Sequence, residues 1–139
     1  MEIDCDVTRM NVSLIHRFLS EESLWANGIS LPVVEKSLKN SLCFGGYINA
    51  NQIAFARVIS DFATFANLVD VFVLPEHRGH GYGKELMQAV ISHPELQGLR
   101  RFTLATADAH DLYNQYGFTP LVKPQVFMER YDPHIYKSS

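Results

Sequence analysis

The 139-residue chain predicts an α/β (α+β) fold with a mixed, mostly antiparallel central sheet and helices on both of its faces. The first observation is the order of the patterns along the chain, β-α-α-β-β-β-α-β-α-β, which interleaves period-two and helical periodicities. The second is a β-rich run at 69–74 that leads through a glycine-rich loop into an amphipathic helix. The length fits one domain, which we expect to span residues 1–139.

In the first half of the chain, short apolar repeats predict two helices and three strands. Val12, Ile15 and Leu19 share one helical face, and Asn11 can cap that helix. Pro32 suits the first turn of the second helix, where its missing N–H is tolerated. The predicted elements are a strand at Cys5–Thr8, a helix at Asn11–Leu19, a loop at Ser20–Leu31, a helix from Pro32, and strands at Ser41–Ile48 and Gln52–Ile59 joined by a turn at Asn49–Asn51.

In the second half, breakers separate the patterns more clearly. Pro75 ends the strand at 69–74, and Gly117 suits the C-terminal end of a short helix for which Asp108 is the expected N-cap. The predicted elements are the strand at 69–74, a helix at 81–92, a strand at 101–106, a helix at 108–115 and a strand that starts at Phe118.

The loop Arg78–Lys84 has the character of a phosphate site. Its three glycines let the backbone N–H groups approach a ligand at the positive end of a helix dipole, and its two basic side chains add charge. A Walker-type loop would need a glycine at Arg78 and Ser or Thr at Glu85. A dinucleotide fingerprint would need a glycine at Lys84. Both of these alternatives therefore fail.

Two blocks together resemble the GCN5-related N-acetyltransferase (GNAT) superfamily. The first is Arg78-Gly79-His80-Gly81-Tyr82-Gly83, which resembles the pyrophosphate loop of that family. The second resembles the family pattern Asn-x-x-Ala-x-x-Leu-Tyr-x-x-x-Gly-Phe, at the family's distance from the loop. The chain matches it at Ala109, Leu112, Tyr113, Gly117 and Phe118 and departs from it at Thr106, where the family has Asn.

The resemblance implies an enzyme that moves an acetyl group from acetyl-CoA, a co-substrate, to a primary amine on a small molecule or a protein. In such enzymes the amine attacks the thioester directly in a ternary complex. The pantetheine arm would bond to the backbone of Val71, Phe72 and Val73. Thr106 stands where the family's Asn contacts the coenzyme arm, and its hydroxyl is the expected coenzyme-binding group there. The pyrophosphate would contact Arg78, Gly79, His80, Gly81, Tyr82, Gly83 and Lys84.

The resemblance also assigns a general acid. Tyr113 matches the tyrosine that protonates the departing coenzyme sulfur, and a phenol keeps its proton at neutral pH. The general base stays open: Asp70 on the ligand-facing strand, Asp61, the more distant Glu22, or a chain of water. Residues considered for an acceptor pocket are Trp25, Tyr47, Phe62 and Phe65.

Other chemistries find little support. His77 and His80 lack a third ligand nearby in sequence, so no metal is expected, and His110 is interpreted as a surface residue. The net charge of −3 argues against nucleic-acid binding. No apolar run predicts a membrane segment or signal peptide, and Cys5 and Cys43 fit free thiols, so we expect a cytoplasmic protein.

Two functions of other classes remain as alternatives. One is an acyl-CoA binding or sensing module that has kept the fold without the chemistry. The other is a nucleotide-binding protein with an unusual phosphate loop. Neither the acceptor nor the oligomeric state follows from the sequence, although homodimers are frequent in the family that the chain resembles.

Overall fold

The computed structural model, which describes residues 1–137, is built on a five-stranded sheet in the order β1-β2-β3-β4-β5. The first four strands run antiparallel to their neighbours, and β5 alone runs parallel to β4. The predicted mixed, mostly antiparallel sheet is therefore confirmed. The strands are β1 (Glu2–Asp4), β2 (Leu42–Ile48), β3 (Asn51–Ser60), β4 (Phe65–Val73) and β5 (Arg101–Leu104), and the α-helices are α1 (Val12–Arg17), α2 (Leu31–Lys39), α3 (Tyr82–Ser92) and α4 (His110–Asn114).

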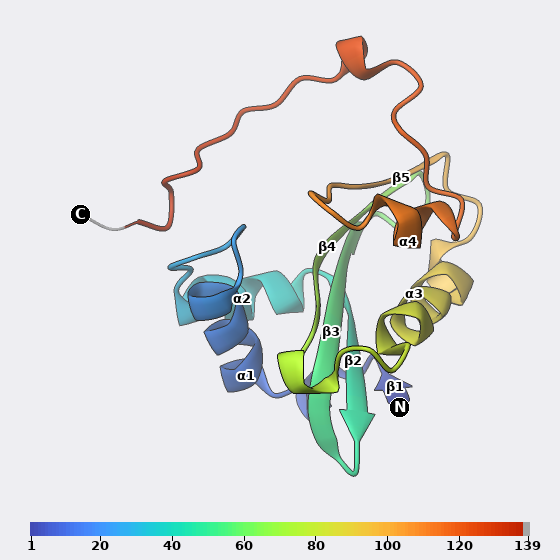
Figure 1. Ribbon diagram of the computed structural model, residues 1–139. Coiled ribbons are helices and arrows are strands. Elements are labelled where there is room, and N and C mark those ends of the chain that lie inside the picture. The colour runs from blue at the N-terminus through green and yellow to red at the C-terminus, as the bar shows by residue number, and fades with distance from the viewer. Residues whose placement is uncertain (138–139) are drawn as a thin grey trace.

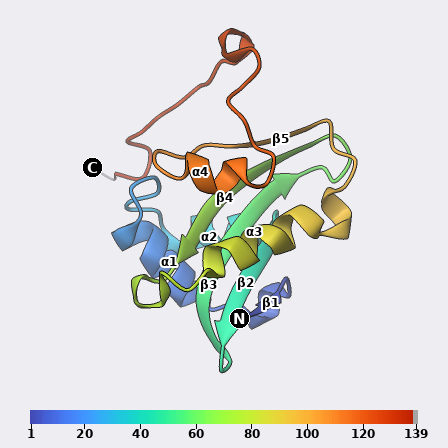
Figure 2. The same cartoon turned by 45° about the vertical axis from the view of Figure 1, so that its right-hand side comes forward.

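Helices cover both faces of the sheet, as predicted, with α1 and α2 on one face and α3 and α4 on the other (Figures 1 and 2). Because successive side chains of a strand alternate, β3 supplies both cores. Ala54, Ala56 and Val58 pack with α3, whereas Phe55 packs with α1 and α2. The sheet thus separates two apolar clusters, and β4 lies between them at the side nearest β5.

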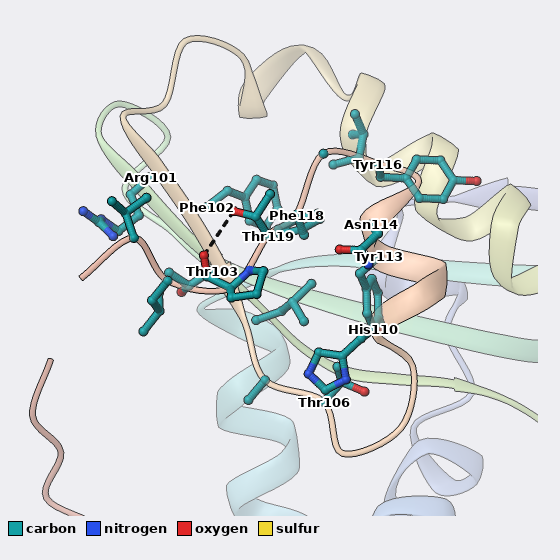
Figure 3. A pocket seen from close by; sticks show the side chains of 17 residues that line it. Arg101, Phe102, Thr103, Thr106, His110, Tyr113, Asn114, Tyr116, Phe118 and Thr119 are labelled. Carbon is teal, nitrogen blue, oxygen red and sulfur yellow. Dashed lines mark hydrogen bonds between the residues drawn. The ribbon is translucent and has the colours of Figure 1, made fainter. Parts of the chain in front are cut away.

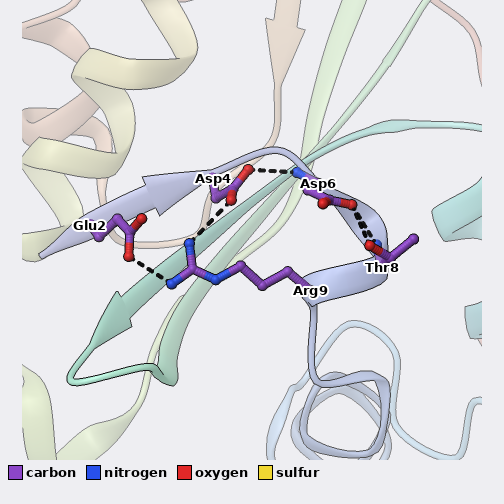
Figure 4. Close-up of polar contacts among 5 residues, drawn as sticks. All are labelled: Glu2, Asp4, Asp6, Thr8 and Arg9. Atoms are coloured by element: carbon purple, nitrogen blue, oxygen red, sulfur yellow. Dashed lines mark hydrogen bonds and ion pairs between the residues drawn. The ribbon is translucent and has the colours of Figure 1, made fainter.

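The N-terminal region differs from the prediction. The first strand is Glu2–Asp4, and Cys5–Thr8 instead leads into a 3-10 turn at Val7–Arg9. The turn forms because the Asp6 carboxylate accepts hydrogen bonds from the Thr8 N–H and hydroxyl (Figure 4). Arg9 then folds back and pairs with Asp4 at 3.1 Å and with Glu2 at 2.6 Å. These polar contacts override the strand propensity of the segment.

Helix boundaries shift by small amounts. Asn11 caps α1 as predicted, since its side chain accepts from the Leu14 N–H at 3.0 Å. The helix continues as a π-helical turn at Phe18–Glu22. The hairpin between β2 and β3 turns through Asn49 and Ala50, both at positive φ. Within residues 1–137, no helix combines the length and apolarity needed to cross a membrane.

The strand predicted from Phe118 is absent from the described residues. After α4 the chain leaves the sheet and forms a long arm that carries a 3-10 turn at Pro124–Val126 (Figure 1). Pro120 and Pro124 each lack a backbone donor, which disfavours a regular ladder here. The outer edge of β5 consequently has no strand beside it in residues 1–137.

Candidate active site

The site is organised by the separation of two parallel strands. The ladder between β4 and β5 runs from the pair Phe65 and Arg101 to the pair Leu68 and Leu104 and then ends. The rest of β4, Val69–Val73, has no strand partner on the β5 side within the described residues. This stretch contains all three backbone positions predicted to bind the pantetheine arm. Its N–H and C=O groups can therefore pair with an amide-containing ligand that enters between the strands.

A β-bulge sharpens this separation. Asp70 has a φ of 56°, and the register with β3 shifts so that Phe55 faces Phe72 while Arg57 faces Val69. Leu68 packs in the α3 cluster, whereas Phe72 packs in the α1 and α2 cluster. Four residues apart on a regular strand, they would share a face, so the bulge inserts one residue. Asp is among the residues that tolerate such a backbone conformation.

The Asp70 carboxylate is held by two donors. Its Oδ1 accepts from Trp25 Nε1 at 2.8 Å, and its Oδ2 accepts from Arg57 Nε at 2.9 Å. The side chains of Asp70 and Arg57 are only 9% and 15% exposed, and Arg57 also donates to Ser41 Oγ. The structure thus places this candidate base in an ion pair that joins β3, β4 and the loop before α2. Sequence reasoning missed Arg57, although a lone arginine within an apolar strand is a signal for a buried partner.

The other candidate bases lie apart from this network. Asp61 accepts from the N–H groups of Ala63, Thr64 and Phe65 and from the Thr64 hydroxyl. These hydrogen bonds stabilise the ionised form and hold the pKa of Asp61 far below its usual range. Asp61 therefore builds the turn between β3 and β4. Glu22 is exposed at the end of the π-helical turn.

Tyr113 lies on α4 and lines a cavity of about 620 Å³ between β5, α4 and the segment Gly117–Val122 (Figure 3). Its side chain is buried and meets the Phe118 ring edge to face, with centroids 6.1 Å apart. Burial, followed by the nearby Asp108 charge, raises the pKa of Tyr113 above its ordinary value of 10. Within residues 1–137 its hydroxyl has no hydrogen-bond partner, so a proton is available for donation.

The start of α4 explains the position of Thr106. Its hydroxyl accepts from the Ala109 N–H at 3.0 Å, and Ala109 occupies the N-cap position. Asp108, the predicted N-cap, makes no capping hydrogen bond within residues 1–137, and the N-cap position falls on Ala109. The Thr106 hydroxyl can still donate its hydrogen to a ligand.

The glycine-rich loop leads from β4 into α3. Gly79 and Gly81 have φ values of 83° and 80°, and open space surrounds Gly79, Gly81 and Gly83. No side chain of the described residues caps α3, so its first N–H groups point outward, free to bind an anion. Arg78 Nε donates to the Val73 carbonyl at 3.0 Å and fixes the loop to the end of β4. Tyr116 donates to the Lys84 carbonyl at 3.0 Å and ties α3 to the α4 segment.

The aromatic candidates for an acceptor pocket separate into two groups. Trp25, Phe62 and Phe65 are exposed, and Trp25 is fixed to Asp70 beside the bulge. Tyr47 is buried on β2, with the Arg9 guanidinium 4.1 Å from its ring centroid. It packs against β1, at the opposite end of the sheet from β5, and so belongs to the core.

The mixed sheet, the separated strands β4 and β5 and the glycine-rich loop are the features that the resemblance to the GNAT superfamily implied, and comparison with known proteins agrees. The sequence pattern of the Acetyltransferase (GNAT) domain matches residues 39–120. A predicted acetyltransferase of Gibberella zeae is 30% identical in an alignment 135 positions long, which covers 81% of this chain and 75% of the relative. This chain therefore belongs to the GNAT acetyltransferase family, whose members use acetyl-CoA.

Solved structures give the same fold. A crystal structure of a predicted GNAT-family acetyltransferase from Xanthomonas campestris is 58% identical and superposes with a TM-score of 0.97, covering 99% of this chain and 96% of that one. A predicted acetyltransferase from Clostridium acetobutylicum, crystallised with acetyl-CoA, is 17% identical with a TM-score of 0.60 and 86% coverage of both chains. The second similarity concerns the fold alone.

Proposed function

We propose that the protein transfers the acetyl group of acetyl-CoA to a primary amine by direct attack in a ternary complex, and that residues 1–139 form this one catalytic domain. One observation carries the proposal. The free β4 edge at Val69–Val73 leads into an uncapped, glycine-rich start of α3, while Tyr113 stands on the helix that follows β5. Donor binding and proton donation thus come from neighbouring elements.

In this proposal the coenzyme is bound mainly by backbone groups. The N–H groups from Gly79 to Lys84 hold the pyrophosphate, with Arg78 and Lys84 adding charge. The pantetheine arm pairs with the β4 edge at Val71, Phe72 and Val73, and a backbone N–H there polarises the thioester carbonyl. Thr106 donates a hydrogen bond from the opposite side.

The reaction requires two proton transfers. The amine nitrogen attacks the thioester carbon, the carbon–nitrogen bond forms and the carbon–sulfur bond breaks. Tyr113 donates its proton to the departing sulfur. The proton lost by the amine passes through water to Asp70. Trp25 and Arg57 each donate to one oxygen of this carboxylate, and a water molecule can use a lone pair that remains on either oxygen.

Donor binding is tested by isothermal titration with acetyl-CoA. Gly81→Glu places a negative charge where the pyrophosphate would bind, and we expect it to abolish detectable binding. Gly98→Glu is the matched control, because Gly98 also has a positive φ, 73°, and open space around it but lies outside the loop. No binding by the wild type, or equal loss in both variants, would contradict the proposed donor site.

Catalysis is tested by thiol release across a panel of polyamines, arylalkylamines, amino acids, aminoglycosides and peptides. We expect Tyr113→Phe to lower turnover by about 10²-fold or more, the usual size of a general-acid contribution, while leaving the affinity for acetyl-CoA unchanged. Acetyl-CoA binding without thiol release for any amine would instead favour an acyl-CoA binding module.

A further inference from the structure

The C-terminal arm, residues 121–137, is an unusually bare part of the molecule. It is tied at both ends: it starts beside α4, and Tyr136 packs against the α1 and α2 cluster. Its middle stands off the body (Figure 1). Five of its large apolar side chains are each more than 60% exposed: Val122, Val126, Met128, Tyr131 and Ile135. Exposed apolar side chains concentrated along one short segment mark a contact site.

The arm follows a defined path. The crystal structure from Xanthomonas campestris superposes on 99% of this chain with a TM-score of 0.97. If the arm followed a different path in the two proteins, its residues would not superpose and the TM-score would be lower. The two proteins therefore share the detached path of the arm. We expect the exposed apolar side chains of the arm to contact a binding partner.

The body contains a partly apolar groove next to β5, which we call the β5 slot. The 620 Å³ cavity lies along the outer edge of β5, which has no strand beside it in residues 1–137. Apolar side chains of Phe102, Leu104 and Phe118 line it, and so do Leu121 and Val122 at the start of the arm. Figure 3 shows Phe102 and Phe118 among the lining side chains. An open strand edge next to an apolar groove is suited to an added strand.

The arm contains a segment that can act as this strand. Residues 127–131 run without proline between Pro124 and Pro133, and within the described chain the backbone groups of residues 128–131 have no hydrogen-bond partner. Phe127 contacts its own chain at Arg101, whose Cζ lies 4.9 Å from the ring centroid. Beyond this contact the chain leads away from β5 (Figure 1).

We propose that the protein is a symmetric dimer in which residues 127–131 of each chain enter the β5 slot of the second copy as an added strand. Slot and strand lie in the same chain, so one two-fold contact fills both slots and covers both arms. Tyr113 and Thr106 line the slot. Each active site is thereby completed by the partner chain, a consequence that rests on the proposed function, whereas the dimer does not.

The dimer is tested by sedimentation velocity. We expect the wild type to sediment at twice the chain mass of 15.8 kDa and Met128→Asp to sediment as a monomer. Leu24→Asp is the matched control: Leu24 is 98% exposed and Met128 97%, but Leu24 lies on the body. Neither substitution disturbs a core, so only arm exchange predicts a difference. A monomeric wild type, or equal effects of both variants, would overturn the proposal.

Hydrogen exchange locates the contact without reference to activity. We expect the outward-facing amides of β5 to be protected in the wild type and to exchange at least tenfold faster in Met128→Asp. Equal exchange in the two proteins would exclude β5 as the docking edge. This result holds whether or not the protein acetylates an amine.

Mixed dimers test the shared active site. A Tyr113→Phe chain has a wild-type arm but lacks the general acid, and a Met128→Asp chain has the general acid but an arm that cannot dock. Each variant alone is therefore expected to be poorly active. When the two variants are co-expressed, we expect dimers in which the wild-type arm of the Tyr113→Phe chain enters the slot of the Met128→Asp chain. This one active site is then complete, and thiol release recovers. Mixed dimers that stay as inactive as either parent would overturn the shared site.

Discussion

At the scale of single residues, Asp70 joins parts of the chain that lie far apart in the sequence. Its carboxylate receives Trp25 from the loop before α2 and Arg57 from β3, while its own backbone forms the bulge in β4. The ion pair is largely buried, so solvent screens it little. The position of the free β4 edge therefore depends on this one side chain.

Removal of one partner should show this dependence. We expect Arg57→Met to lower the free energy of unfolding by about 3 kcal/mol, because it leaves a buried carboxylate without its counterion. Urea unfolding measures the change. Glu2→Gln is the control: it also breaks an ion pair with an arginine, but an exposed one, and should have little effect. Similar effects of the two substitutions would contradict the structural role of the buried pair.

This network marks the limit of sequence reasoning at the residue scale. The glycine loop and Tyr113 could be located because their patterns are local. The bulge at Asp70 is a matter of register between β3 and β4, and a strand pattern alone places Asp70 in regular alternation with Val71. Its partners Trp25 and Arg57 become neighbours only after the sheet has formed.

At the scale of elements, local signals predicted β2, β3 and α3 to within about a residue at each end. Apolar alternation, the Asn49–Asn51 turn and Gly81 are sufficient for these. The errors fall where other contacts compete with propensity. Asp6 and Arg9 hold the chain after β1 in a polar turn, and Thr106 rather than Asp108 accepts a hydrogen bond at the start of α4. From Phe118 to residue 137 the chain forms no strand.

The start of α4 can be tested through Thr106. Thr106→Val keeps the shape of the side chain and removes the acceptor for the Ala109 N–H, so we expect a loss of about 1 kcal/mol in the free energy of unfolding. We also expect weaker acetyl-CoA binding, measured by titration, because the proposed donor is lost. Ser92→Ala serves as the control, since the Ser92 hydroxyl donates to the Gln88 carbonyl within α3 and Ser92 does not line the cavity. If both substitutions behaved alike, Thr106 would have neither role.

At the scale of the whole molecule, a thiol buried in one of the two apolar clusters makes stability depend on alkaline pH. Cys43 is a free thiol buried in the cluster under α1 and α2, and it is fully covered by Phe55 and its neighbours. Burial raises the pKa of the Cys43 thiol from 9.0 to about 11. The folded protein therefore holds this proton more tightly than the unfolded chain does.

The sign of the effect follows from linkage. Well below pH 9 the thiol is protonated in both states, and its contribution to stability is fully present. Between pH 9 and about 11 the unfolded chain loses the proton first, so stability falls as the pH rises. A shift of this size corresponds to about 3 kcal/mol.

Urea unfolding at pH 8 and pH 11 should show this loss in the wild type and a smaller one in Cys43→Ala. Tyr47 and Tyr113, whose pKa values are also raised, contribute equally to both proteins, so the difference in slope isolates the thiol. Parallel slopes would mean that the pKa of the Cys43 thiol is not raised in the folded protein, which would contradict its burial.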